Sequence, residues 1–228
     1  MSILDRGTLR DAQTVDYVDS SVLSGHKVLR NTYLLLSMTL LFSALTAGLS
    51  MAMALPSPGI IVTLIGYFGL LFLTTKLRNS AWGIASVFAL TGFMGLTLGP
   101  IISRYLGMSG GSGIVMSAMG LTAVIFMGLS AYVLISKRDF SFMGGFLAVG
   151  VLVAFVAGLG AIFFEIPALS VAVSAAFVLL MSGMILFETS NIVRGGETNY
   201  IMATVSLYIT IFNLFTSLLQ LLGFMEKE

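Results

Sequence analysis

The stretch SFMGGFLAVGVLVAFVAGLGAIFFEIPALSVAVSAAFVLLMSGMILF, residues 141–187, contains a single charged residue, Glu165. Glu165 and the nearby Pro167 divide it into two apolar segments, at 141–164 and 166–187. A helix needs about 20 apolar residues to cross the hydrocarbon core of a bilayer, and each segment reaches that length. The stretch therefore predicts two membrane-spanning helices joined by a short turn.

The rest of the chain has the same character. Of its 228 residues, 57% are hydrophobic and only 9% are charged, whereas a soluble domain carries about 25% charged residues. So few charges cannot cover a water-facing surface. We therefore predict an all-α integral membrane protein, a bundle of seven transmembrane helices at 32–54, 59–75, 81–102, 113–135, 141–164, 166–187 and 200–224.

The lysines and arginines predict the orientation of the bundle, because they are retained on the cytoplasmic side of a membrane. With seven spans, only Arg104 and Lys227 fall on one side. The other nine fall together on the opposite side: Arg6, Arg10, Lys27, Arg30, Lys76, Arg78, Lys137, Arg138 and Arg194. We therefore expect a cytoplasmic N-terminus and a periplasmic C-terminus. A six-span or eight-span arrangement would scramble this asymmetry.

The N-terminal segment differs from the remainder of the chain. Residues 1–25 are polar and have too little apolar surface to fold alone, so we expect a flexible cytoplasmic tail ahead of a transmembrane domain at 26–228. The first apolar stretch is too long for the apolar region of a signal peptide. The chain has no cysteine, and its single histidine, His26, lies beside this tail. We expect no metal site of the His/Cys kind and no cofactor.

Glu188 is the one acidic residue predicted to lie within the apolar zone, near the cytoplasmic end of the sixth span. Asn191, three residues later, shares its helix face if the helix continues. One interpretation is a buried carboxylate that exchanges protons or ions, because a charge inside a membrane usually marks function. The other is a helix-end glutamate that reaches interfacial water or pairs with Lys76 or Arg194.

The last span carries polar residues at intervals of four and three, a helical period that places them on one face. They are Ser206, Thr210, Asn213, Ser217 and Gln220. A stripe that extends over about 21 Å should face the bundle interior. Its hydroxyls and amides either hydrogen-bond between helices or line a path for water or ions, and the mild, uncharged groups favour the first.

Two glycine motifs carry less information. Gly95 and Gly99 form a small-xxx-small pair, which predicts close helix packing. Gly107, Ser109 and Gly111 match the G-x-S-x-G pattern of serine hydrolases, which requires a strand-to-helix turn and a histidine. The charge asymmetry places His26 on the other side of the membrane, so we expect that the protein is not an enzyme.

Several of these segments together resemble the Bax inhibitor family. GLTLGP (95–100), FETSN (187–191) and SLYITIFNLF (206–215) look like the signatures of that family, and the resemblance extends over all seven spans. HKVLRNTY (26–33), LPSPG (55–59) and GGETNY (195–200) resemble an enterobacterial inner-membrane member most closely. That member is a substrate and modulator of the membrane-bound AAA protease FtsH, and the polar tail fits this role.

Other members of the family are pH-sensitive calcium leak channels, in which acids on the sixth and seventh helices share protons and a basic residue on the second helix binds them. By resemblance, Glu188 occupies the first acidic position, Thr210 the second and Lys76 the basic one. Thr210 cannot ionise, so the sensor would lack its second acid. The resemblance thus implies either an FtsH modulator or a calcium or proton leak channel whose candidate site contains Glu188, Thr210, Lys76, Asn191 and Asn213. A transporter would show inverted repeats and broken helices, and neither is clear in the sequence.

Overall fold

The computed structural model describes the backbone of residues 3–226 and the side chains of residues 27–226. All regular structure in this part of the chain is helical: α1 (Ile3–Ala52), α2 (Gly59–Leu77), α3 (Trp82–Leu106), α4 (Gly111–Ser136), η1 (Ser141–Met143), α5 (Gly144–Phe163), α6 (Pro167–Val193) and α7 (Tyr200–Met225). Seven of these helices are long and apolar enough to cross a membrane, the first of them through its segment Lys27–Ala52. The prediction of a seven-span all-α protein is confirmed. The expected flexible tail falls on residues whose side chains lie outside the described part, and it stays a prediction.

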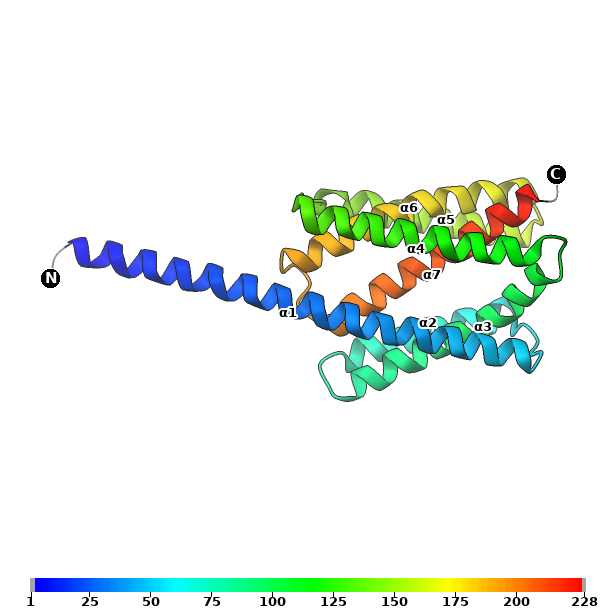
Figure 1. The fold of residues 1–228 in the computed structure, drawn as a ribbon, viewed down its shortest axis with the longest axis horizontal. Helices are drawn as coiled ribbons and strands as arrows, with labels where there is room; N and C mark the ends of the chain where they lie inside the picture. The colour runs from blue at the N-terminus through cyan, green and yellow to red at the C-terminus, as the bar shows by residue number, and fades with distance from the viewer. Residues whose placement is uncertain (1–2, 227–228) are drawn as a thin grey trace.

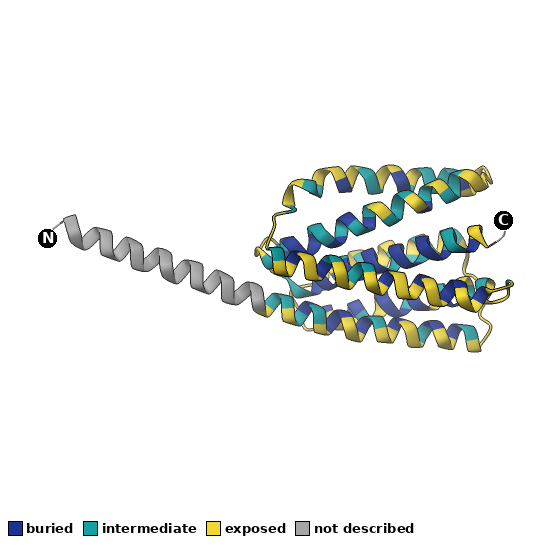
Figure 2. Ribbon diagram, turned by 45° about the horizontal axis from the view of Figure 1, so that its top comes forward, coloured by how far each residue is buried: buried dark blue, intermediate teal, exposed yellow. Residues whose placement is uncertain are grey.

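Helix α7 lies at the centre of the bundle (Figure 1). It packs against α1 and α3 on one side and against α4 and α6 on the other, while α2 packs on α3 and α5 on α6. In the most apolar stretch of α7, 56% of the residues are buried, against 6% in that of α2. In Figure 2, α7, the helix that leads to the C-terminus, is largely dark blue (buried), while the outer helices carry yellow, exposed faces. The chain thus forms two groups of three helices, α1–α3 and α4–α6, that enclose the last helix.

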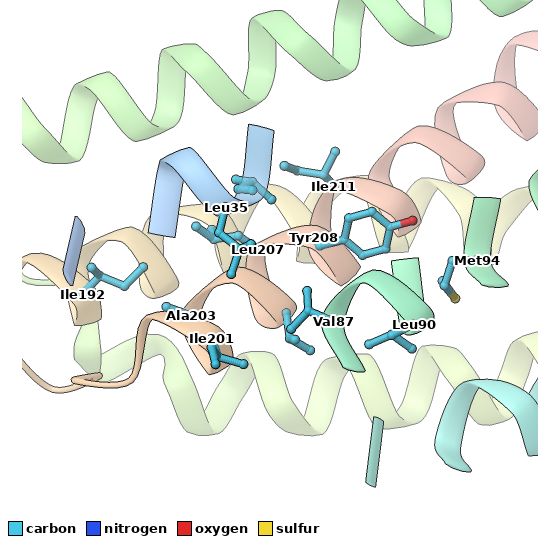
Figure 3. Packing of buried hydrophobic residues seen from close by; sticks show 12 residues of the cluster. Leu35, Val87, Leu90, Met94, Ile192, Ile201, Ala203, Leu207, Tyr208 and Ile211 are labelled. Carbon is cyan, nitrogen blue, oxygen red and sulfur yellow. The ribbon is translucent and has the colours of Figure 1, made fainter. Parts of the chain in front are cut away.

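Two apolar clusters hold α7 in place. The first joins α7 to α1 and α3 through Leu207 and Tyr208, which pack with Leu35, Val87 and Leu90 (Figure 3). The second joins the other half of α7 to α4 and α6, through Ile114, Ala118, Ile185, Leu214 and Leu219. Because each half of α7 is buried against a different group, the two groups are joined mainly through this helix.

The glycine pair on α3 lies against α1, as predicted. A Cβ atom on Gly95 would overlap the Thr46 hydroxyl and the Ser43 carbonyl. One on Gly99 would lie 2.5 Å from the Ser50 hydroxyl and 2.9 Å from the Ala47 carbonyl. The hydroxyl of Ser50 donates to the carbonyl of Leu96 at 2.9 Å, a bond that only such close backbones permit.

Helices α6 and α3 continue farthest past their predicted ends. Helix α6 continues to Val193, beyond the predicted end at 187, because Glu188, Thr189 and Ser190 are buried by packing and do not end the helix at the membrane surface. Helix α3 continues past Pro100 to Leu106. A sequence estimate that ends each span at its first polar residue misses these turns.

The helices alternate in direction, so the start of the α1 span shares one end of the bundle with the α2–α3, α4–α5 and α6–α7 connections (Figure 1). We call this the cation-rich end, because Lys27, Arg30, Lys76, Arg78, Lys137, Arg138 and Arg194 lie there. Arg104 lies at the opposite end, in the last turn of α3. The clustering of cations agrees with the sequence analysis, while the side of the membrane that they face remains a prediction.

Candidate functional site

The buried carboxylate of Glu188 forms the centre of the candidate site. Glu188 lies on α6 and is 8% exposed; Thr210 lies on α7 and is 2% exposed. The Thr210 hydroxyl lies 3.2 Å from Oε1 and 3.1 Å from Oε2 of Glu188, so it donates to the carboxylate in a shared bond. The structure therefore brings together the two residues that the resemblance placed at the paired acidic positions.

Glu188 and Thr210 line a cavity of about 590 Å³ between α2, α3, α5, α6 and α7. It reaches from Ser57 and Pro58, in the α1–α2 turn at the opposite end of the bundle, to Glu188 in the last two turns of α6. Most of its walls are aliphatic and aromatic. Its ionisable side chains are Glu188 and Tyr67, and no lysine or arginine lines it. The cavity is thus mainly apolar and has a single carboxylate near the cation-rich end.

The polar stripe of α7 has two environments. Ser206, Thr210 and Asn213 line the cavity. Farther along, Gln220 accepts a hydrogen bond from Ser174 of α6 at 2.8 Å, and Ser217 is buried. Gln220 thus bonds between helices, whereas a path for water or ions along the first half of the stripe stays a prediction.

Lys76 and Asn191 are placed apart from this centre. Lys76 is exposed at the end of α2, about 13 Å along the helix axis from the cavity-lining Tyr67. Among the described side chains, no cation lies within ion-pair distance of Glu188, and Arg194 instead pairs with Asp139 at 3.6 Å. The carbonyl of Asn191 accepts from the backbone N–H of Gly196 at 2.9 Å, in the turn after α6.

At the cation-rich end, two hydrogen bonds that the sequence analysis did not predict join the α4–α5 connection to the C-terminal end of α6. The backbone N–H of Phe140 donates to the Ser190 hydroxyl oxygen at 3.1 Å, and Arg194 Nη2 donates to the Lys137 carbonyl at 3.0 Å. These bonds hold the α4–α5 connection against the end of α6. The spacing of the four residues along the chain carries no sign of them.

A second buried contact was also missed. The hydroxyls of Ser43 on α1 and Tyr208 on α7 lie 2.6 Å apart, and Tyr208 also donates to the Thr91 carbonyl of α3 at 3.3 Å. Tyr208 is 1% exposed. A buried tyrosine hydroxyl usually has a partner, so a tyrosine inside an apolar helix is a usable signal, although the sequence does not say which helix supplies the partner.

The comparisons with known proteins decide the family. The sequence model described as an inhibitor of apoptosis-promoting Bax1 matches residues 25–227. The chain belongs to the Bax inhibitor family. Its similar relatives include an uncharacterized Pseudomonas aeruginosa protein, 58% identical over 86% of this chain and 88% of the relative. The Escherichia coli protein named modulator of FtsH protease YccA is 55% identical over 92% of this chain and 95% of its own length.

Further relatives match over a similar length. An uncharacterized membrane protein of Vibrio cholerae is 47% identical over 90% of this chain and 93% of the relative. The protein named inner membrane protein YccA in a second Escherichia coli strain is 55% identical over 92% of this chain and 95% of its own length. With its seven apolar helices, this Bax inhibitor family chain is a multi-pass inner membrane protein.

Proposed function

We propose that this chain modulates the FtsH protease by binding it in the membrane and limiting its degradation of other membrane proteins, and that it is itself a substrate. The observation that carries the proposal is the 55% identity to YccA, which is named a modulator of that protease. The match covers 92% of this chain, so it is not confined to one motif.

The orientation and the surface of the bundle fit this role. We propose that the cation-rich end faces the cytoplasm, which places the N-terminus on the cytoplasmic side and the C-terminus in the periplasm. Binding would occur on lipid-facing helices such as α4, where Gly113, Gly120 and Gly128 leave open space for the backbone of another helix. The polar segment at 1–25 would give the protease a part of the chain to grip.

Co-purification tests the binding step. FtsH is expected to accompany the tagged full-length chain, and to accompany a form that lacks residues 2–25 as well, because the membrane contacts remain. The tail-deleted form is expected to be degraded more slowly by FtsH than the wild type. If FtsH accompanies neither form, the proposal fails. If both forms are degraded at the same rate, the tail is not the segment that the protease grips.

A second candidate function is a calcium or proton leak, and the cavity that ends at Glu188 favours it. A single carboxylate with hydroxyl and amide neighbours offers few of the six to eight oxygen ligands that calcium takes. In the described part of the chain there is no group of three or more His, Cys, Asp or Glu side chains that could hold a metal ion. The single carboxylate therefore supports proton exchange or weak ion contact at this position and not a tight calcium site.

Flux measurements in liposomes test this second candidate. Glu188→Gln is expected to change calcium or proton flux and its dependence on pH. Glu197→Gln is the matched control, because Glu197 lies outside the cavity in the α6–α7 turn. Equal flux through the wild type and Glu188→Gln at every pH, or no flux through either, would remove the leak function.

A further inference from the structure

A second cavity lies on the other side of α7, between α1 and α4. Its volume is about 690 Å³. Ala44 and Gly48 of α1 form one wall, Met119 and Ala123 of α4 the other, and Phe212 of α7 lies at the base. Figure 1 shows α7 behind the space between these two helices, and we call the cavity the α1/α4 groove.

The polar atoms in the α1/α4 groove are already paired. Ser43 bonds to the Tyr208 hydroxyl at 2.6 Å, and the Thr122 hydroxyl donates to the Ala118 carbonyl at 2.7 Å. The other lining groups are apolar. A buried water needs two to four polar partners, so this groove offers water little and suits an apolar occupant.

The length of the groove distinguishes between apolar occupants. Along α1 it extends from Leu40 to Met51, about 16 Å at 1.5 Å per residue, and along α4 from Val115 to Met127, about 18 Å. It therefore begins where α1 ends and α4 starts, and stops in the middle of both spans. Half of a hydrocarbon core of about 30 Å is 15 Å, so the groove is one leaflet deep. A transmembrane helix of a partner would need a groove of full membrane depth.

The groove opens on the lipid-facing surface of the bundle. Leu45 and Leu49 on α1 are 71% and 55% exposed, so the groove is continuous with the face that contacts the bilayer. Arg104, in the last turn of α3, is two residues from both Ile102 and Leu106, which line the groove. Residues two apart on a helix point to different faces, so Arg104 marks the level of the membrane surface at this end but does not line the groove.

We propose that the α1/α4 groove binds one acyl chain of a phospholipid from the leaflet at the end of the bundle opposite the cation-rich end. The chain enters between Met51 and Val115 and ends against Phe126 and Tyr208. A lipid held there fills the space between the α1–α3 and α4–α6 groups and keeps them separated at this end.

Retention of phosphatidylglycerol by the full chain tests the proposal. After reconstitution with this lipid and extensive washing in detergent, the wild type is expected to keep about one phospholipid per chain, since the groove is one leaflet deep. Gly48→Trp places a large ring in the groove and should reduce retention about tenfold. Gly69→Trp is the matched control, because Gly69 on α2 also has open space around its Cβ position but does not line the groove.

Additional variants keep the proposal falsifiable if Gly48→Trp does not fold. Ala123→Trp fills the groove from its other wall and should lose the lipid equally. Arg104→Gln should leave retention unchanged, because Arg104 does not line the groove. No retained lipid in the wild type, or equal retention by the wild type and both groove-filling variants, would overturn the proposal. The chain has no cysteine, so a disulfide-linked dimer of Gly48→Cys would assign the groove to a second copy and also overturn it.

Discussion

The hydrogen bond between Thr210 and Glu188 gives a quantitative prediction for Thr210→Val. The substitution keeps the shape of the side chain and removes the only hydroxyl that donates to this carboxylate among the described contacts. A hydrogen bond to a charged group contributes about 1.5–3 kcal/mol, and one between neutral groups about 0.5–1.5 kcal/mol. The observed distances of 3.1 and 3.2 Å exceed the usual 2.5–2.7 Å of strong O–H···O⁻ bonds, which favours a contribution where the two ranges meet.

We therefore expect Thr210→Val to lower the free energy of unfolding by about 1.5 kcal/mol, near the upper limit measured for hydrogen bonds between membrane helices. The assay is unfolding by sodium dodecyl sulfate in mixed micelles, followed by circular dichroism. Ser206→Ala is the control: Ser206 lines the same cavity, has no bond to Glu188, and its loss should change stability by less than about 0.5 kcal/mol.

A double-mutant cycle isolates the bond itself. In a Glu188→Met background the acceptor is gone, so Thr210→Val should cost nothing and can even stabilise the protein by removing an unpaired hydroxyl. If Thr210→Val costs the same in both backgrounds, the bond to Glu188 does not explain its effect and the description of the site is wrong.

Three further predictions concern the packing and the ends of the bundle. Gly95→Ala should destabilise the protein by about 1–3 kcal/mol because the added methyl overlaps α1, whereas Gly120→Ala, in open space, should be neutral or slightly stabilising in the same unfolding assay. Asn199→Ala should cost about 1–2 kcal/mol, because the Asn199 side chain caps α7 and donates to the Arg78 carbonyl; Asn199→Asp should restore the cap alone. The pKa of Asp139 lies below its usual value because Ser141 donates to the carboxylate and Arg194 lies beside it. The stability gained from ionised Asp139 should therefore be present above about pH 4 and lost as the pH falls through the lowered pKa, a dependence that Asp139→Asn should lack in unfolding curves measured at each pH.

The sequence predicted the fold because hydropathy and charge are properties of single segments. Each span could be recognised by its own length, and the cations of the short connections gather at one end because the helices alternate in direction. The glycine pair Gly95 and Gly99 was also recognisable, since its spacing alone indicates a face that a neighbouring backbone can approach.

The candidate site could be predicted only in part, because its parts come from different helices. Periodicity placed Thr210 and Asn213 on one face of α7, and resemblance added Glu188. Neither indicated that Lys76 lies outside the cavity. Whether a residue of α2 lies at the same depth in the membrane as a residue of α6 depends on how the two helices pack, which the sequence of one helix does not show. The Ser43–Tyr208 bond and the α1/α4 groove depend on packing in the same way, so no local pattern predicts them.

The most direct test of the proposed function is the rate at which purified FtsH degrades a second membrane protein in the same liposomes, measured at increasing ratios of this chain. We expect the rate to fall and then level off as the chain occupies the protease, with the tail-deleted form still lowering it through the membrane contacts. A degradation rate that stays unchanged at every ratio, with the chain correctly folded and inserted, would contradict the account.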